Sequence, residues 1–134
     1  MLDTMNASTC EMDLELPPDP SSVAKARHAV LEIVRGTGAP EQEVALAVSE
    51  AVGNAVVHAF RFGKTGTVKV RARREDSALI VTVADNGVGM IPDVDNPGLG
   101  VGTSLISRLS EEATFESSEE GTTVTMRFQV EEDA

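Results

Sequence analysis

Polar side chains recur at every fourth position within an apolar segment, where Glu50, Asn54 and His58 follow one another. At about 100° per residue, a helix would place these three on a stripe about 80° wide. Asparagine is a poor helix former, and the neighbouring Gly53 costs a helix up to about 1 kcal/mol relative to alanine. Unfavourable residues at this spacing indicate a functional site. The alternative is a solvated polar face on which His58 is an ordinary helix residue.

A second group of polar residues, DNGVG at residues 85–89, directly follows a β-branched run. Such a carboxylate at the mouth of a sheet could accept a hydrogen bond from an exocyclic amine, and the glycines would let a ligand ring approach the backbone. The same residues also suit a simple turn at the end of a strand.

A glycine-rich loop, GLGVG at residues 98–102, comes just before an expected helix. Free backbone N–H groups and the helix dipole make such a place attractive to phosphate. The alternative is a flexible loop followed by a capped helix. The later Gly121-Thr122-Thr123 reads, by itself, as a turn before the last strand.

The elements that must position these motifs follow from hydrophobic periodicity. Alternation predicts strands at 12–16, 68–73, 113–116 and 124–130, and the continuous run 78–84 predicts a central strand buried on both faces. A helix that Ser21 or Ser22 can cap should end at Gly36 or Gly38, a second should span 40–60, and a third 103–109. The expected buried stripe of the second helix, largely opposite the polar stripe, consists of Val44, Val48, Ala51, Val52, Ala55 and Ala59. This order predicts an α/β layer with helices on one face.

Composition restricts the class of protein. A net charge of −11 over 134 residues argues against binding to nucleic acid or to an anionic membrane. A single cysteine and two histidines exclude an internal disulfide and make a zinc site improbable. With no signal peptide and no apolar run of membrane-spanning length, we expect a cytoplasmic protein. The basic strip at 69–74 is either the solvent side of a strand or a docking face for an acidic partner.

Taken in order, the four motifs resemble those of the GHKL ATPase superfamily, whose members have the Bergerat nucleotide-binding fold. The stretches VSEAVGNAVVH (48–58), DNGVGM (85–90) and GTTVTMRF (121–128) resemble one branch, the bacterial anti-sigma-factor serine/threonine kinases. The resemblance implies an α+β two-layer sandwich with a mixed, mostly antiparallel sheet. It places the ATPase domain at residues 12–130, between a flexible tail at 1–11 and an acidic tail at 131–134.

The resemblance also assigns residues to ATP and Mg²⁺. Glu50 matches the general base, Asn54 matches the Mg²⁺ ligand, and Asp85 matches the aspartate that accepts from the adenine amino group. Either Thr122 or Thr123 should help to hold the adenine. The other residues that the resemblance places around the nucleotide are Asn86, Gly87, Gly89, Met90, Gly98, Leu99, Gly100, Val101, Gly102 and Thr103.

The activity that the resemblance implies is phosphorylation of a STAS-type anti-anti-sigma protein by a kinase that otherwise sequesters a sigma factor. Homodimers are common in this branch. One departure leaves a second reading open, because no lysine or arginine occurs between Glu75 and Ser107, where the branch carries a basic residue near the γ-phosphate. The alternatives are therefore a non-catalytic, ATP-binding partner switch or, less compatible with the chain's length, a detached catalytic domain of a sensor histidine kinase.

Overall fold

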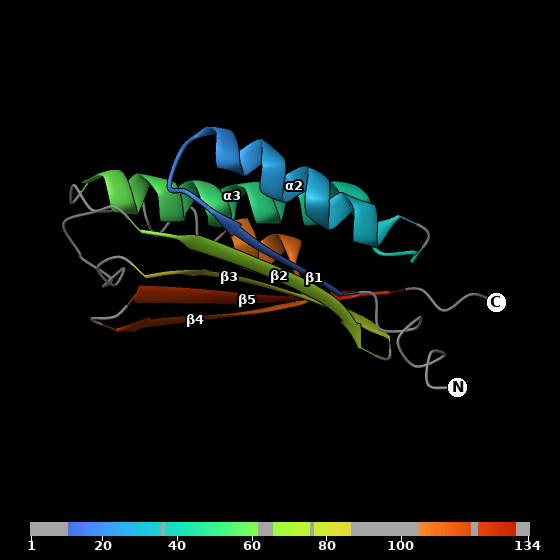
Figure 1. Ribbon diagram of the computed structural model, residues 1–134. Coiled ribbons are helices and arrows are strands. Elements are labelled where there is room, and N and C mark those ends of the chain that lie inside the picture. Colours follow the sequence, from blue (N-terminus) through green and yellow to red (C-terminus); the bar gives the residue numbers. More distant parts are fainter. Residues whose placement is uncertain are drawn as a thin grey trace, which may run out of the picture.

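The fold has two layers, a five-stranded sheet and two long helices that lie across one of its faces (Figure 1). The computed structural model describes residues 11–35, 37–61, 66–75, 77–86, 105–118 and 121–130. The helices are α2 (Ser21–Val34) and α3 (Glu41–Arg61). The strands are β1 (Glu11–Leu16), β2 (Val68–Glu75), β3 (Ala78–Asp85), β4 (Glu112–Ser118) and β5 (Gly121–Gln129). Residues 105–109 are also helical.

The sheet has the strand order β1-β2-β3-β5-β4, and each pairing between described strands is antiparallel. The predicted α/β sandwich with helices on one face is therefore confirmed. The last strand, β5, lies between β3 and β4, so it runs through the interior of the sheet. This insertion brings the two site segments at 85–86 and 121–122 side by side.

The core forms between the sheet and the helices, as the alternating strands predict. On β2, Val68, Val70 and Ala72 are buried, whereas Lys69 and Arg71 are exposed. Such alternation places one face of a strand against the core and the other in solvent. The α3 residues that are buried as predicted are Val44, Val48, Ala51, Val52 and Ala55, and the side chain of Ala59 lies outside the described part.

The start of α2 corrects the predicted cap. Pro20 occupies the cap position without a side-chain cap hydrogen bond, and Ser21 and Ser22 are already helical. The hydroxyl of the buried Ser22 donates to the carbonyl of Pro17 at 2.7 Å, and the carboxylate of Asp19 accepts from Ser21. A buried hydroxyl needs an acceptor, so packing of the first turn against the preceding segment prevails over capping.

Strand β3 corrects a second prediction, because it is central but not buried on both faces. Val81 and Val83 are buried toward the helices, while Ile80 and Thr82 are half-buried and line a hollow of about 370 Å³ on the other face. Hydrophobicity alone did not reveal that this face is open. A parallel sheet would have needed helices on both sides, but this antiparallel sheet does not.

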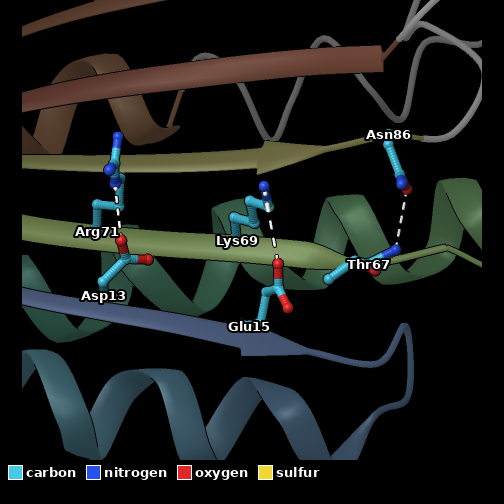
Figure 2. Close-up of polar contacts among 6 residues, drawn as sticks. All are labelled: Asp13, Glu15, Thr67, Lys69, Arg71 and Asn86. Atoms are coloured by element: carbon cyan, nitrogen blue, oxygen red, sulfur yellow. Dashed lines mark hydrogen bonds and ion pairs between the residues drawn. The ribbon is translucent and has the colours of Figure 1, made fainter.

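The open face of the sheet carries ion pairs between neighbouring strands (Figure 2). Arg71 Nε lies 3.2 Å from the carboxylate of Asp13, and Lys69 Nζ lies 3.7 Å from that of Glu15. All four side chains are more than half exposed. The basic strip thus includes the solvent side of β2, as one of its two interpretations predicted.

Candidate functional site

Asp85 ends β3, and strands on both sides set its position. It lies directly opposite Val68 of β2 and opposite Thr122 of β5. Residues that face each other in an antiparallel ladder project to the same face of the sheet. Val68 and Thr122 are only 1% and 2% exposed, so all three project toward the helix layer. The half-buried Asp85 carboxylate can therefore accept a hydrogen bond from a group held between the two layers.

The register separates the two threonines that the sequence left as alternatives. Thr123 pairs with Ala84 and lines a hollow of about 590 Å³ on the open face of the sheet, together with Thr82. Of the two threonines, Thr122 shares a face with Asp85, and Thr123 projects to the opposite one. Both Asp85 and Thr122 have interaction partners within the structure.

Asn86 has an intramolecular partner that its motif does not reveal. Its Oδ1 atom accepts a hydrogen bond from the backbone N–H of Thr67 at 2.9 Å (Figure 2). Thr67 directly precedes β2, so this bond connects the residue after β3 to the residue before the neighbouring strand β2. The sequence assigned Asn86 to the nucleotide, and the structure shows a bond that holds the sheet's end together.

Glu50 and Asn54 lie on α3, which packs against β2, β3 and β5. Both are half-buried, so the polar stripe borders the buried stripe. The prediction that the two stripes lie largely opposite each other is wrong. The reason is that the buried stripe is wider than predicted. Ala47 is fully buried and lies only about 20° from Asn54 around the helix axis.

The second half of α3 and the Asp85 end of the sheet lie at the same end of the molecule (Figure 1). Helix α3 ends at Arg61, and β2 begins at Val68, which pairs with Asp85. The seven Cα–Cα steps from Arg61 to Val68 can span at most about 25 Å. Asn54 lies only about two helical turns before Arg61, so the helix and sheet motifs are brought to one region.

The donor set suits a cation held mainly by a ligand's own oxygens. Within the described ranges, no group of three or more His, Cys, Asp or Glu side chains could hold a metal ion. The carboxamide oxygen of Asn54 would be a single protein ligand. Mg²⁺ commonly binds in this way, through one or two protein oxygens together with substrate phosphates and water.

Several predicted site residues lie outside the described residues. They are Gly87, Gly89, Met90, Gly98, Leu99, Gly100, Val101, Gly102 and Thr103, together with the side chain of His58. Their assignment to the nucleotide remains a prediction. Conversely, sequence reasoning overlooked Gly66 and used Gly121 only as a turn residue and as part of the GTT motif, although a Cβ atom added at either glycine would meet the Asp85-Asn86 segment.

Comparison with known families now adds to this geometry. The model of the histidine kinase-like ATPase domain matches residues 16–128. The chain belongs to this family. As a histidine kinase-like ATPase domain, it has the layered fold that the resemblance predicted, with Glu50, Asn54, Asp85 and Thr122 all inside the matched range. Among the described residues, no helix is both long and apolar enough to cross a membrane.

The curated relatives of this ATPase domain include anti-sigma F factors, which confirms the likeness to the anti-sigma branch. That of Lysinibacillus sphaericus is 36% identical over 91 residues, covering 58% of this chain and 62% of the relative. That of Geobacillus stearothermophilus is 34% identical over 98 residues, covering 63% and 66%. The chain thus spans slightly less than two thirds of these relatives. The anti-sigma F factor of Clostridium botulinum is 28% identical and aligns over 87% of this chain and 92% of its own length.

Solved structures support the fold of the ATPase domain. The RsbU and RsbW domains of Rv1364c from Mycobacterium tuberculosis match with a TM-score of 0.70 and 23% identity, covering 92% of this chain and 33% of that one. The SiaB–SiaC complex from Pseudomonas aeruginosa matches with a TM-score of 0.59 and 17% identity, covering 98% and 95%. At these identities the likeness concerns the fold alone.

Proposed function

We propose that this protein is a cytoplasmic, ATP-dependent serine/threonine kinase that acts as an anti-sigma factor. In this proposal it phosphorylates a STAS-type anti-anti-sigma protein and, in its other state, sequesters a sigma factor. The ATPase domain would occupy residues 12–130 together with Glu11, the first residue of β1, and tails would flank it. Homodimers, which the resemblance implies, form part of the same proposal.

One observation carries the proposal: the second half of α3, which carries Asn54, and the Asp85–Thr122 pair lie at the same end of the matched domain. Asp85 and Thr122 project toward the helix layer, and Glu50 and Asn54 border the buried stripe of the helix in that layer. A nucleotide held between the layers could thus place its base at the sheet and its phosphates at α3.

The roles of the side chains follow from their chemistry. The Asp85 carboxylate would accept from the adenine amino group, and Thr122 would support the base. Asn54 would hold Mg²⁺, which supplies charge neutralisation on the phosphates. Glu50 would accept the proton of the acceptor hydroxyl as that oxygen bonds to the γ-phosphorus and the bond to ADP breaks.

The choice of partner rests on the relatives, whose names describe them as anti-sigma F factors. The acidic chain, with a net charge of −11, would be attracted to a basic surface on a sigma factor. Nucleotide state would bias the balance between the two partners by favouring one complex over the other.

The deciding experiment is a calorimetric titration of ATP, with and without Mg²⁺, into nucleotide-free protein. We expect Mg²⁺-dependent binding that weakens in Asn54→Ala. Gln42→Ala is the matched control, because it removes an exposed amide from the first turn of the same helix. The chain has no tryptophan or tyrosine, so residual nucleotide is readily detected by its ultraviolet absorbance. Folded, nucleotide-free protein that binds neither ATP nor ADP would contradict the proposal.

A second candidate function is supported by one sequence feature, the absence of lysine and arginine between Glu75 and Ser107. Phosphoryl transfer depends strongly on positive charge near the γ-phosphate. A protein that bound ATP without transferring phosphate would still switch partners. Incubation with labelled ATP and a STAS-domain protein separates the two functions, because only the kinase labels the acceptor.

A further inference from the structure

The end of β3 lies close to two glycines, Gly121 at the start of β5 and Gly66 two residues before β2. On the β5 side, Gly121 has a φ of +143°, a conformation that side-chain-bearing residues rarely adopt. A Cβ atom added there would lie 1.9 Å from the carbonyl oxygen of Asp85 and 3.0 Å from the Cα atom of Asn86. The backbone of β5 can therefore approach Asp85 this closely only because residue 121 has no side chain.

On the β2 side, Gly66 lies close to the side chain of Asn86, not to its backbone. A Cβ atom added at Gly66 would lie 2.4 Å from Asn86 Oδ1, the atom that accepts the hydrogen bond from the Thr67 N–H at 2.9 Å. The Asn86 side chain could move away from such a Cβ only by changing the geometry of that bond. Figure 2 shows this contact bridging the start of β2 and the residue that follows β3.

These contacts bear on Asp85 because it is the last residue of its strand. The pairs Asp85–Val68 and Asp85–Thr122 are the final ones that β3 makes with each neighbour. A strand end held only by its last ladder pair is prone to fray. A carboxylate on a frayed strand end has no fixed direction. The Asn86–Thr67 bond extends the restraint one residue beyond the ladder, and Gly121 lets the β5 backbone approach that residue closely.

We propose that Gly66, Asn86 and Gly121 are positioning residues that fix the direction of the Asp85 carboxylate and so determine the preference for adenine. The inference rests on the proposed function, in which Asp85 accepts from the adenine amino group. It assigns Asn86 a role through Asp85 and not through direct contact with the nucleotide. Recognition of a base by one carboxylate requires a well-directed acceptor, because hydrogen bonds weaken steeply with misalignment.

The experiment compares the Kd of ATP with that of purine riboside triphosphate, which lacks the 6-amino group. The Kd of wild-type protein for ATP should be about tenfold or more lower than its Kd for the analogue. This is the difference expected from one hydrogen bond to a charged acceptor. In Gly121→Ala and in Asn86→Ala, this preference should fall to within about threefold of unity as the carboxylate loses its direction.

Two control variants distinguish positioning from general destabilisation. Gly38→Ala strains a glycine with a φ of +85° in the α2–α3 connection, next to the opposite end of α3, and should lower the melting temperature without changing the ATP preference. Asn86→Asp keeps the acceptor oxygen for Thr67 and should restore most of the preference that Asn86→Ala loses.

The outcomes separate the two proposals. If wild-type protein binds no nucleotide, the proposed function fails and the inference fails with it. If wild-type protein prefers ATP, and folded Asn86→Ala and Gly121→Ala keep that preference, only the inference is overturned. If Gly121→Ala does not fold, the comparison of Asn86→Ala with Asn86→Asp decides alone. An equal loss in Gly38→Ala would also overturn the inference, because the effect would then be one of stability.

Discussion

Asp85 and Thr122 are direct partners across β3 and β5, and both project toward the helix-covered face of the sheet. The pairing joins two motifs that are distant in the chain. It also makes Thr122, and not its neighbour Thr123, the threonine positioned to act together with Asp85.

Thr122→Val should weaken ATP binding roughly 3- to 10-fold, the value of one neutral hydrogen bond, because it removes a hydroxyl of nearly the same size. The matched control is Thr125→Val on the same strand, whose side chain is half-buried and projects to the open face. Calorimetric titration of both variants measures the difference. Equal losses in the two variants would argue against a base-binding role for Thr122.

Glu50→Gln should abolish phosphoryl transfer to a STAS-domain acceptor while leaving ATP binding intact. Glutamine has almost the same shape but cannot accept the hydroxyl proton, and loss of a general base costs about 10²- to 10⁴-fold in rate. Glu43→Gln, an exposed change in the first turn of α3, is the control. Single-turnover transfer of labelled phosphate gives the rate. A rate in Glu50→Gln that matches wild type would exclude Glu50 as the base.

The ion pair between Asp13 and Arg71 should contribute little to stability. Its two side chains are 62% and 70% exposed, so water screens the 3.2 Å contact. A double-mutant cycle with Asp13→Asn and Arg71→Gln should give a coupling energy of about 0.2–1 kcal/mol, which decreases at high salt. Urea unfolding followed by circular dichroism provides the free energies, since the chain lacks tryptophan and tyrosine. A coupling well above that range, unchanged by salt, would show that the pair is not screened.

The periodic spacing of apolar residues predicted most helices and strands, because it reflects burial of one face of each element. Helix α3 begins and ends within one residue of its predicted bounds, and β2 alternates as expected. The same rule failed for β3, where an apolar run indicated burial on both faces although Ile80 and Thr82 face the open side. Residue type also placed the cap of α2 on Ser21 or Ser22. A side chain's suitability for capping does not reveal that the Ser22 hydroxyl is bonded to the preceding segment.

The sequence named candidate site residues but could not give their arrangement. Glu50, Asn54 and Asp85 were named from their motifs, and the second half of α3 lies at the same end of the molecule as the Asp85 end of β3. The choice between Thr122 and Thr123 could not be made, because it depends on the register of β5 against β3, a pairing between distant segments. Likewise, no local pattern indicates that Asn86 bonds to Thr67, since that contact exists only once β2 and β3 have paired.

Gly53→Ala should stabilise the protein by about 0.5–1 kcal/mol, because glycine within a helix costs about that much relative to alanine. The added methyl group has room, since no heavy atom lies within 4 Å of the position that it would occupy. For a domain of this size, the melting temperature should rise by roughly 2–4 °C. Thermal unfolding followed by circular dichroism measures the change, and it must be made on nucleotide-free protein because bound ATP would itself raise the melting temperature. A lower melting temperature would mean that Gly53 is needed by the fold. The predicted gain would instead mean that stability does not explain a glycine between Glu50 and Asn54, which leaves close approach of a ligand to this part of α3 as its physical reason.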